Sequence, residues 1–68
     1  MMANPVKDKN YNLISSIYHL AQGSENCKQY ASDSQRDNDD ETTKLFEELQ
    51  RFYSEHGEKA AKILKNRL

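Results

Sequence analysis

Cysteine, proline and glycine are scarce in this chain, and tryptophan is absent. The 68 residues include one cysteine, one proline and two glycines. A lone cysteine cannot close a disulfide within its own chain, so Cys27 is expected to be a small, half-buried side chain on a helix; the alternative is a thiol that cross-links two copies. Two glycines are too few for a glycine-rich phosphate-binding loop. Residues 1–7, which contain Pro5, show no apolar period and are expected to form a flexible N-terminal arm.

An excess of charge and a long apolar run are also missing. Ten basic and eleven acidic residues leave a formal net charge of −1, so no global field attracts nucleic acid or an anionic membrane. No stretch approaches the roughly 20 apolar residues that a membrane span requires. We therefore expect a cytoplasmic protein that binds neither nucleic acid nor membrane.

The apolar residues that are present follow a helical period. Hydrophobic residues make up only 35% of the chain, but between residues 11 and 31 they recur at steps of three and four. This spacing predicts a first helix over about 8–31, with Asp8 as its N-cap. Gly23 interrupts the stripe. It either lets a bulky ring or a neighbouring backbone come close or is a tolerated weak point, and the sequence leaves both alternatives open.

A polar segment separates this helix from a second one. Residues 32–37 are rich in short polar side chains that compete for backbone hydrogen bonds, which predicts the turn. Asn38 with Glu41 has the pattern of a capping box, and acidic residues follow at the expected helix start. The second helix is predicted over about 38–66. Together, residues 8–68 are expected to form one all-α domain, an antiparallel two-helix hairpin.

Each predicted helix carries more apolar surface than a two-helix seam needs. Leu13, Ile17 and Leu20 form one row, and Tyr11, Ile14, Tyr18 and Ala21 form the next. Docking two hairpins into a four-helix bundle would bury both rows, so a homodimer is expected; another helical protein is the alternative partner. The residues expected at this interface are Leu13, Ile14, Ile17, Leu20, Leu45, Leu49, Phe52 and Ile63.

No complete catalytic site is visible, and neither an enzymatic activity nor a cofactor is expected. A carboxylate-bridged di-iron site requires Glu-x-x-His on one helix, because residues three apart share a face. The residue three before His56 is Tyr53, so that motif is absent. Basic residues in the second helix alternate with acidic ones, which is typical of a solvated, self-paired face.

Two segments carry a resemblance. Tyr-His-Leu-Ala-Gln-Gly-Ser-Glu at 18–25 and Leu-Phe-Glu-Glu-Leu-Gln at 45–50 resemble small bacterial ferritin-like helical-hairpin proteins. The resemblance implies a hairpin that is half of a four-helix bundle, with Glu25 and His56 near the places where such proteins hold ligands. It supports an alternative function: a metal-binding or metal-storage accessory protein whose site, shared between subunits, uses Glu25, Glu48 and His56.

The leading hypothesis is a non-enzymatic, self-associating helical module that acts in scaffolding or protein binding. A hairpin that stays monomeric and offers its groove to an amphipathic helix is a third alternative.

Overall fold

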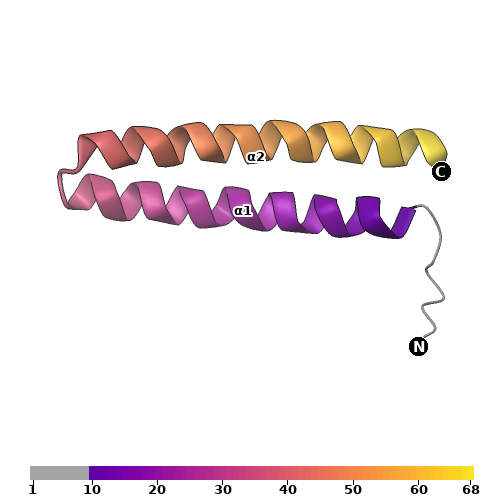
Figure 1. Cartoon of the computed structure of the whole chain (residues 1–68), viewed down its shortest axis with the longest axis horizontal. Helices are drawn as coiled ribbons and strands as arrows, with labels where there is room; N and C mark the ends of the chain where they lie inside the picture. The colour runs from indigo at the N-terminus through magenta and orange to yellow at the C-terminus, as the bar shows by residue number, and fades with distance from the viewer. Residues whose placement is uncertain (1–9) are drawn as a thin grey trace, which may run out of the picture.

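The chain folds into two long antiparallel helices lying side by side (Figure 1). In this computed structural model the described residues are 10–68, with α1 spanning Asn10–Arg36 and α2 spanning Asp40–Arg67. The prediction of an all-α, antiparallel two-helix hairpin is confirmed. The expected N-terminal arm at residues 1–7 and the Asp8 cap lie outside the described residues.

The two helices meet along a seam of alternating three- and four-residue steps, which is the spacing of a coiled-coil contact. Its register is fixed by facing pairs: Ser34 with Thr43, Gly23 with Tyr53, Leu20 with Gly57, and Asn10 with Arg67. The seam runs along α1 through Leu13, Ile17, Leu20, Ser24, Cys27, Ala31 and Ser34, and along α2 through Thr43, Phe46, Gln50, Tyr53, Gly57, Ala60 and Leu64.

Only small side chains are fully enclosed by this seam. Across residues 10–68, the buried side chains are Cys27, Ala31, Ser34, Thr43 and Ala60, and no large side chain falls below 2% exposure. Hydrophobic stabilisation scales with the apolar area removed from water, so a single hairpin gains little of it. A chain of this length usually needs a further source of stability, such as association with another chain.

The first helix extends through residues 32–36, which the sequence analysis assigned to the turn. Side-chain bonds within this segment support the extra length: Gln29 Nε2 donates to Asp33 Oδ1 at 3.0 Å, and Arg36 pairs with Asp33 at 2.8 Å. Ser34 is also drawn into the seam, where its hydroxyl lies 2.7 Å from that of Thr43. Tertiary contact and local pairing thus outweigh the low helix propensity of serine and aspartate.

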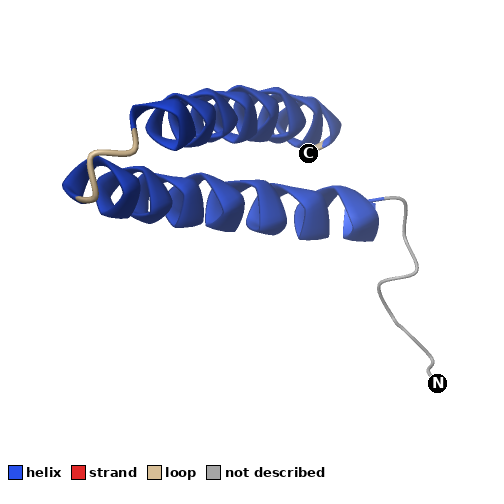
Figure 2. Cartoon of the chain, turned by 60° about the vertical axis from the view of Figure 1, so that its left-hand side comes forward, coloured by secondary structure: helices blue, strands red, loops and turns tan. Residues whose placement is uncertain are grey.

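The turn itself is only Asp37, Asn38 and Asp39 (Figure 2). Asn38 adopts a left-handed backbone with φ of 61°, and the Asp39 N–H reaches back to the carbonyl of Ser34 at 2.9 Å. The Asn38 N–H donates to the Gln35 carbonyl at 3.0 Å, which completes the pair of bonds of a Schellman motif. Asparagine tolerates this left-handed geometry better than most residues, because its short polar side chain limits the clash.

The second helix is capped one residue later than the sequence analysis expected. Asp39, not Asn38, is the N-cap: its carboxylate accepts from the Thr42 N–H at 3.2 Å and from the Thr42 hydroxyl at 2.6 Å. Asn38 is needed in the left-handed position, so the cap moves to the next residue. The two hydrogen bonds from Thr42 hold the pKa of Asp39 below its usual value, with the side-chain bond as the larger cause.

Charge along α2 matches its dipole. Asp40 and Glu41 lie in the first turn, and Lys65 and Arg67 lie in the last. Neither helix of the described chain contains a stretch that is both long and apolar enough to cross a lipid bilayer.

Candidate interaction surface

The hairpin presents two broad faces, one on each side of the seam. At 100° per residue, positions next to the seam point to one face or the other, and the antiparallel register decides which rows of α1 and α2 share a face. Ile17 and Ala21 of α1 line one shallow groove together with Gly57 and Ala61 of α2. These residues therefore mark one face, and the rows on the other side of the seam make up the opposite face.

The face without this groove is almost free of charge, and we call it the neutral face. Among residues 10–68, its only charged side chains are Asp33 and Lys59. Large apolar side chains lie open on it, with exposed fractions of 51% for Phe52, 49% for Leu45 and 47% for Tyr30. Its rows comprise Asn12, Ser16, His19, Gly23, Asn26, Tyr30 and Asp33 on α1, and Thr42, Leu45, Leu49, Phe52, His56, Lys59, Ile63 and Asn66 on α2.

Aromatic rings gather in the middle of the neutral face. The ring centroids of Phe52 and His56 are 4.1 Å apart, and those of Phe52 and Tyr53 are 6.1 Å apart. His56 Nδ1 lies 3.0 Å from the Phe52 carbonyl oxygen, which orients the imidazole along α2. Tyr30 of α1 meets Phe46 of α2 at a centroid distance of 5.4 Å. These contacts order two groups of rings, one around Phe52 and one at Tyr30, and both of these side chains are about half exposed to solvent.

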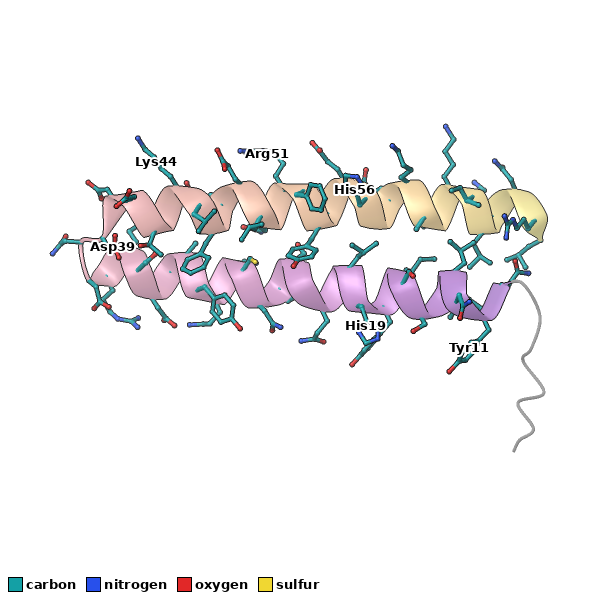
Figure 3. The ribbon with its side chains drawn as sticks, viewed as in Figure 1. Tyr11, His19, Asp39, Lys44, Arg51 and His56 are labelled. Carbon is teal, nitrogen blue, oxygen red and sulfur yellow. The ribbon has the colours of Figure 1, made fainter. Side chains whose placement is uncertain are left out.

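The opposite face is apolar only along the first half of α1 and carries charge elsewhere. Its α1 rows carry Tyr11, Ile14, Tyr18 and Ala21, followed by Glu25 and Lys28, and the side chain of Tyr11 projects from α1 away from α2 (Figure 3). We call it the tyrosine face. Its α2 row carries alternating charges at Lys44, Glu47, Arg51, Glu58 and Lys65.

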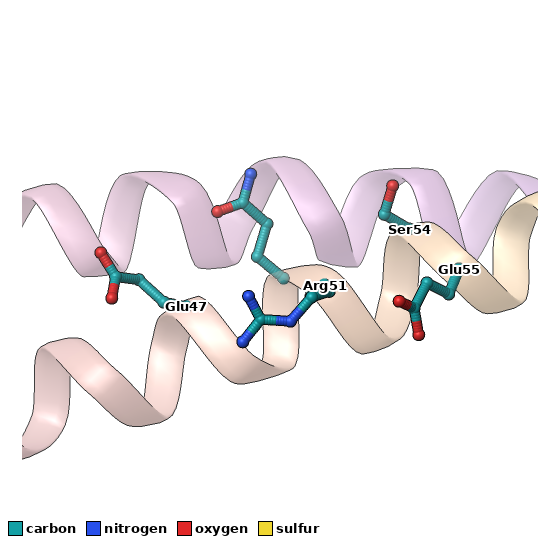
Figure 4. A pocket seen from close by; sticks show the side chains of 5 residues that line it. Glu47, Arg51, Ser54 and Glu55 are labelled. Carbon is teal, nitrogen blue, oxygen red and sulfur yellow. The ribbon is translucent and has the colours of Figure 1, made fainter.

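A second shallow groove on the tyrosine face is polar. It is lined only by α2 residues, and Arg51 stands in it between Glu47 and Glu55, each four residues away (Figure 4). Charges at this spacing on a helix stabilise one another in water. This row is therefore suited to solvent.

The structure divides the residues expected at the interface into three groups. Leu13, Ile17, Leu20 and Leu49 are half-buried along the contact between α1 and α2. Ile14 is 50% exposed on the tyrosine face. The remaining three, Leu45, Phe52 and Ile63, are exposed on the neutral face. The sequence analysis placed Ile14 in the same surface as Leu45 and Phe52, but the two helices turn these side chains to opposite sides.

The three candidate metal ligands do not converge within one hairpin. Glu25 lines the groove of the tyrosine face, whereas His56 lies on the neutral face. Glu48 is exposed on the side of α2 that points away from the seam. Within residues 10–68 no group of three or more His, Cys, Asp and Glu side chains is arranged to hold a metal ion. A site shared between two chains stays a prediction.

Two features of the neutral face were missed at the sequence level. In the sequence, Tyr30 is one of the periodic apolar residues between 11 and 31, and His56 is a candidate metal ligand. The signal was present as the near absence of charge at seven-residue spacing, from Ser16 through Gly23 to Tyr30.

Cys27 is buried at 5% exposure in the seam and is a free thiol, which makes it a packing residue of the hairpin.

Comparison of the chain with protein-family models, with curated proteins and with solved structures finds no match in any of the three.

Proposed function

We propose that this protein is a non-enzymatic, self-associating helical module, with a role in scaffolding or protein binding. Two hairpins would form a four-helix bundle, the arrangement that the ferritin-like resemblance also implies. The observation that carries the proposal is the imbalance between a seam that buries only small side chains and the large apolar side chains left open to water.

The exposed side chains are too many and too close together to be incidental. Single exposed hydrophobic residues are normal on protein surfaces, but a contiguous patch marks an interaction site. Tyr30, Leu45 and Phe52 are each about half exposed within one surface. Association would remove these apolar side chains from contact with water, which lowers the free energy.

One face of the hairpin is also the right size for a stable dimer. Helices of 27 and 28 residues extend about 40 Å, and two of them side by side are about 20 Å wide. The projected area of one face, about 800 Å², is of the same order as the accessible surface that each partner typically buries in a stable interface. A bundle of two hairpins would also give the chain the larger core that its length does not provide alone.

Sedimentation equilibrium of the wild-type protein tests this proposal. We expect a mass of twice the 7.9 kDa of one chain at micromolar concentration. A folded species of 7.9 kDa throughout the concentration range would contradict self-association and would favour a hairpin that awaits a different helical partner.

A further inference from the structure

We propose that the neutral face is the surface through which two copies of this chain pair, and that they pair antiparallel, with the two-fold axis at the level of Phe52. This inference rests on the self-association proposed above and adds the face, the orientation and the register. Each of the three is argued from a different feature of the hairpin.

Charge selects the face. Burying an unpaired charge in an interface is costly, so the core of an interface is depleted of charged residues. The tyrosine face would bring Glu47, Arg51 and Glu58 of α2 into such a core. From the described part of the chain, the neutral face brings in only Asp33 and Lys59, which lie toward opposite ends of the hairpin. A second copy can therefore cover the neutral face without leaving several buried charges unpaired.

The same two charges select the orientation. With Ser34 facing Thr43, Asp33 lies level with the start of α2, whereas Lys59 lies in its last third. If two hairpins stack with their turns at the same end, each charged side chain comes level with the same residue of the partner. If they stack with their turns at opposite ends, Lys59 comes level with the partner's Asp33. Opposite charges at one level favour the second arrangement, and like charges disfavour the first.

The apolar row of α2 sets the register. Leu45 and Lys59 are each seven residues from Phe52, so an antiparallel pair centred on Phe52 places Leu45 level with the partner's Lys59. The two Phe52 rings then meet at the axis, and His56 comes level with the partner's Leu49. The methylene stem of Lys59 can cover Leu45 while its ammonium group stays at the rim. Phe52 and Leu45 thus meet apolar surface of the partner, whereas Ile63, eleven residues from Phe52, comes level with the partner's Glu41 at the start of α2.

The face is tested with two matched substitutions. Phe52→Glu places a carboxylate at the axis, whereas Tyr18→Glu makes a comparable change at an aromatic side chain on the tyrosine face; the two rings are 51% and 62% exposed in the hairpin. We expect Phe52→Glu to raise the dimer dissociation constant by more than about 100-fold, because two buried carboxylates would face each other. We expect Tyr18→Glu to change it by less than about threefold. The reverse pattern, or a dimer that survives Phe52→Glu, would overturn the choice of face.

Orientation and register are tested without removing the Phe52 ring. In a Cys27→Ala background, chains carrying Leu45→Cys are mixed with chains carrying Lys59→Cys and oxidised. We expect a mixed disulfide between the two kinds of chain and little disulfide within either kind alone, because only the mixed pair comes level. A dimer that gives no mixed disulfide overturns the antiparallel register even if Phe52→Glu proves too unstable to interpret.

The two proposals fail in different ways. A folded wild-type monomer would end both of them. A wild-type dimer that keeps its mass in Phe52→Glu and loses it in Tyr18→Glu would leave self-association intact and end only the inference about the neutral face.

Discussion

The ring of Tyr53 lies against the backbone of Gly23: a β-carbon at position 23 would stand 3.1 Å from ring atoms Cδ1 and Cε1 and 3.2 Å from Cδ2. Of the two alternatives that the sequence leaves open for this glycine, the structure has the close approach of a bulky ring. Gly57 differs, because a β-carbon there would meet only the Leu20 β-carbon, at an ordinary 3.6 Å.

The two glycines should therefore respond differently to alanine. Gly57→Ala is expected to stabilise the protein by up to about 1 kcal/mol, the helix propensity that glycine lacks. Gly23→Ala should lose this gain, because the Tyr53 ring, half-buried in the seam, must move aside. Urea denaturation measures both variants. In a Tyr53→Leu background, Gly23→Ala should raise the free energy of unfolding, because the ring is no longer in the way. If Gly23→Ala and Gly57→Ala stabilise the wild-type chain equally, the contact between Gly23 and Tyr53 is contradicted.

A buried hydroxyl pair near the turn gives a second prediction. The Ser34 and Thr43 hydroxyls lie 2.7 Å apart, and Thr43 also donates to the Asp39 carbonyl at 2.8 Å. Thr43→Val should cost about 0.5 to 1.5 kcal/mol, because it removes these hydrogen bonds while the Ser34 hydroxyl can still donate to the Ala31 carbonyl at 3.2 Å. Adding Ser34→Ala should cost less than the two single effects together. Chemical denaturation of the four-member cycle measures the coupling, and simple additivity would show that the pair contributes nothing specific.

The cap of α2 gives a dependence on pH. The hydrogen bonds that Asp39 accepts from Thr42 lower the pKa of Asp39 in the folded state. The contribution of the Asp39 carboxylate to stability is therefore fully present above the unfolded pKa of about 3.9, and it is lost as the pH falls through the lower folded value. Melting temperatures measured from pH 6 downward should drop less steeply for Asp39→Asn than for wild type. Thr42→Val removes the larger cause and should flatten the curve in the same direction. Parallel curves for all three proteins would contradict this cap.

How much of this could be read from the sequence depends on the level of structure. The two helices follow from local periodicity, and their antiparallel pairing follows from the short polar segment that joins them, which is why both could be predicted. The extension of α1 through Ser34 was not, since it depends on a hydroxyl partner nine residues away across the turn. The separation of Ile14 from Phe52 was missed for a similar reason. The register between the two helices decides which rows of α1 and α2 share a face, and the sequence pattern of one helix does not contain that register.

Metal binding can be separated from association by measurement. Glu25, Glu48 and His56 lie on three different sides of the hairpin, so we expect ferrous iron, zinc and a chelator to leave the melting temperature unchanged. A ligand bound to the native state must raise it by mass action. A rise of several degrees with one metal, lost in His56→Ala and accompanied by that metal in elemental analysis, would support the shared site instead.

We propose that association provides the stability that the small seam does not. Thermal unfolding, followed by circular dichroism over a hundredfold range of protein concentration, tests this proposal. For a dimer whose folding and association are linked, the melting temperature must rise with concentration, and helicity must fall on dilution below the dissociation constant. A melting temperature that stays constant, with full helicity in the most dilute sample, would contradict it.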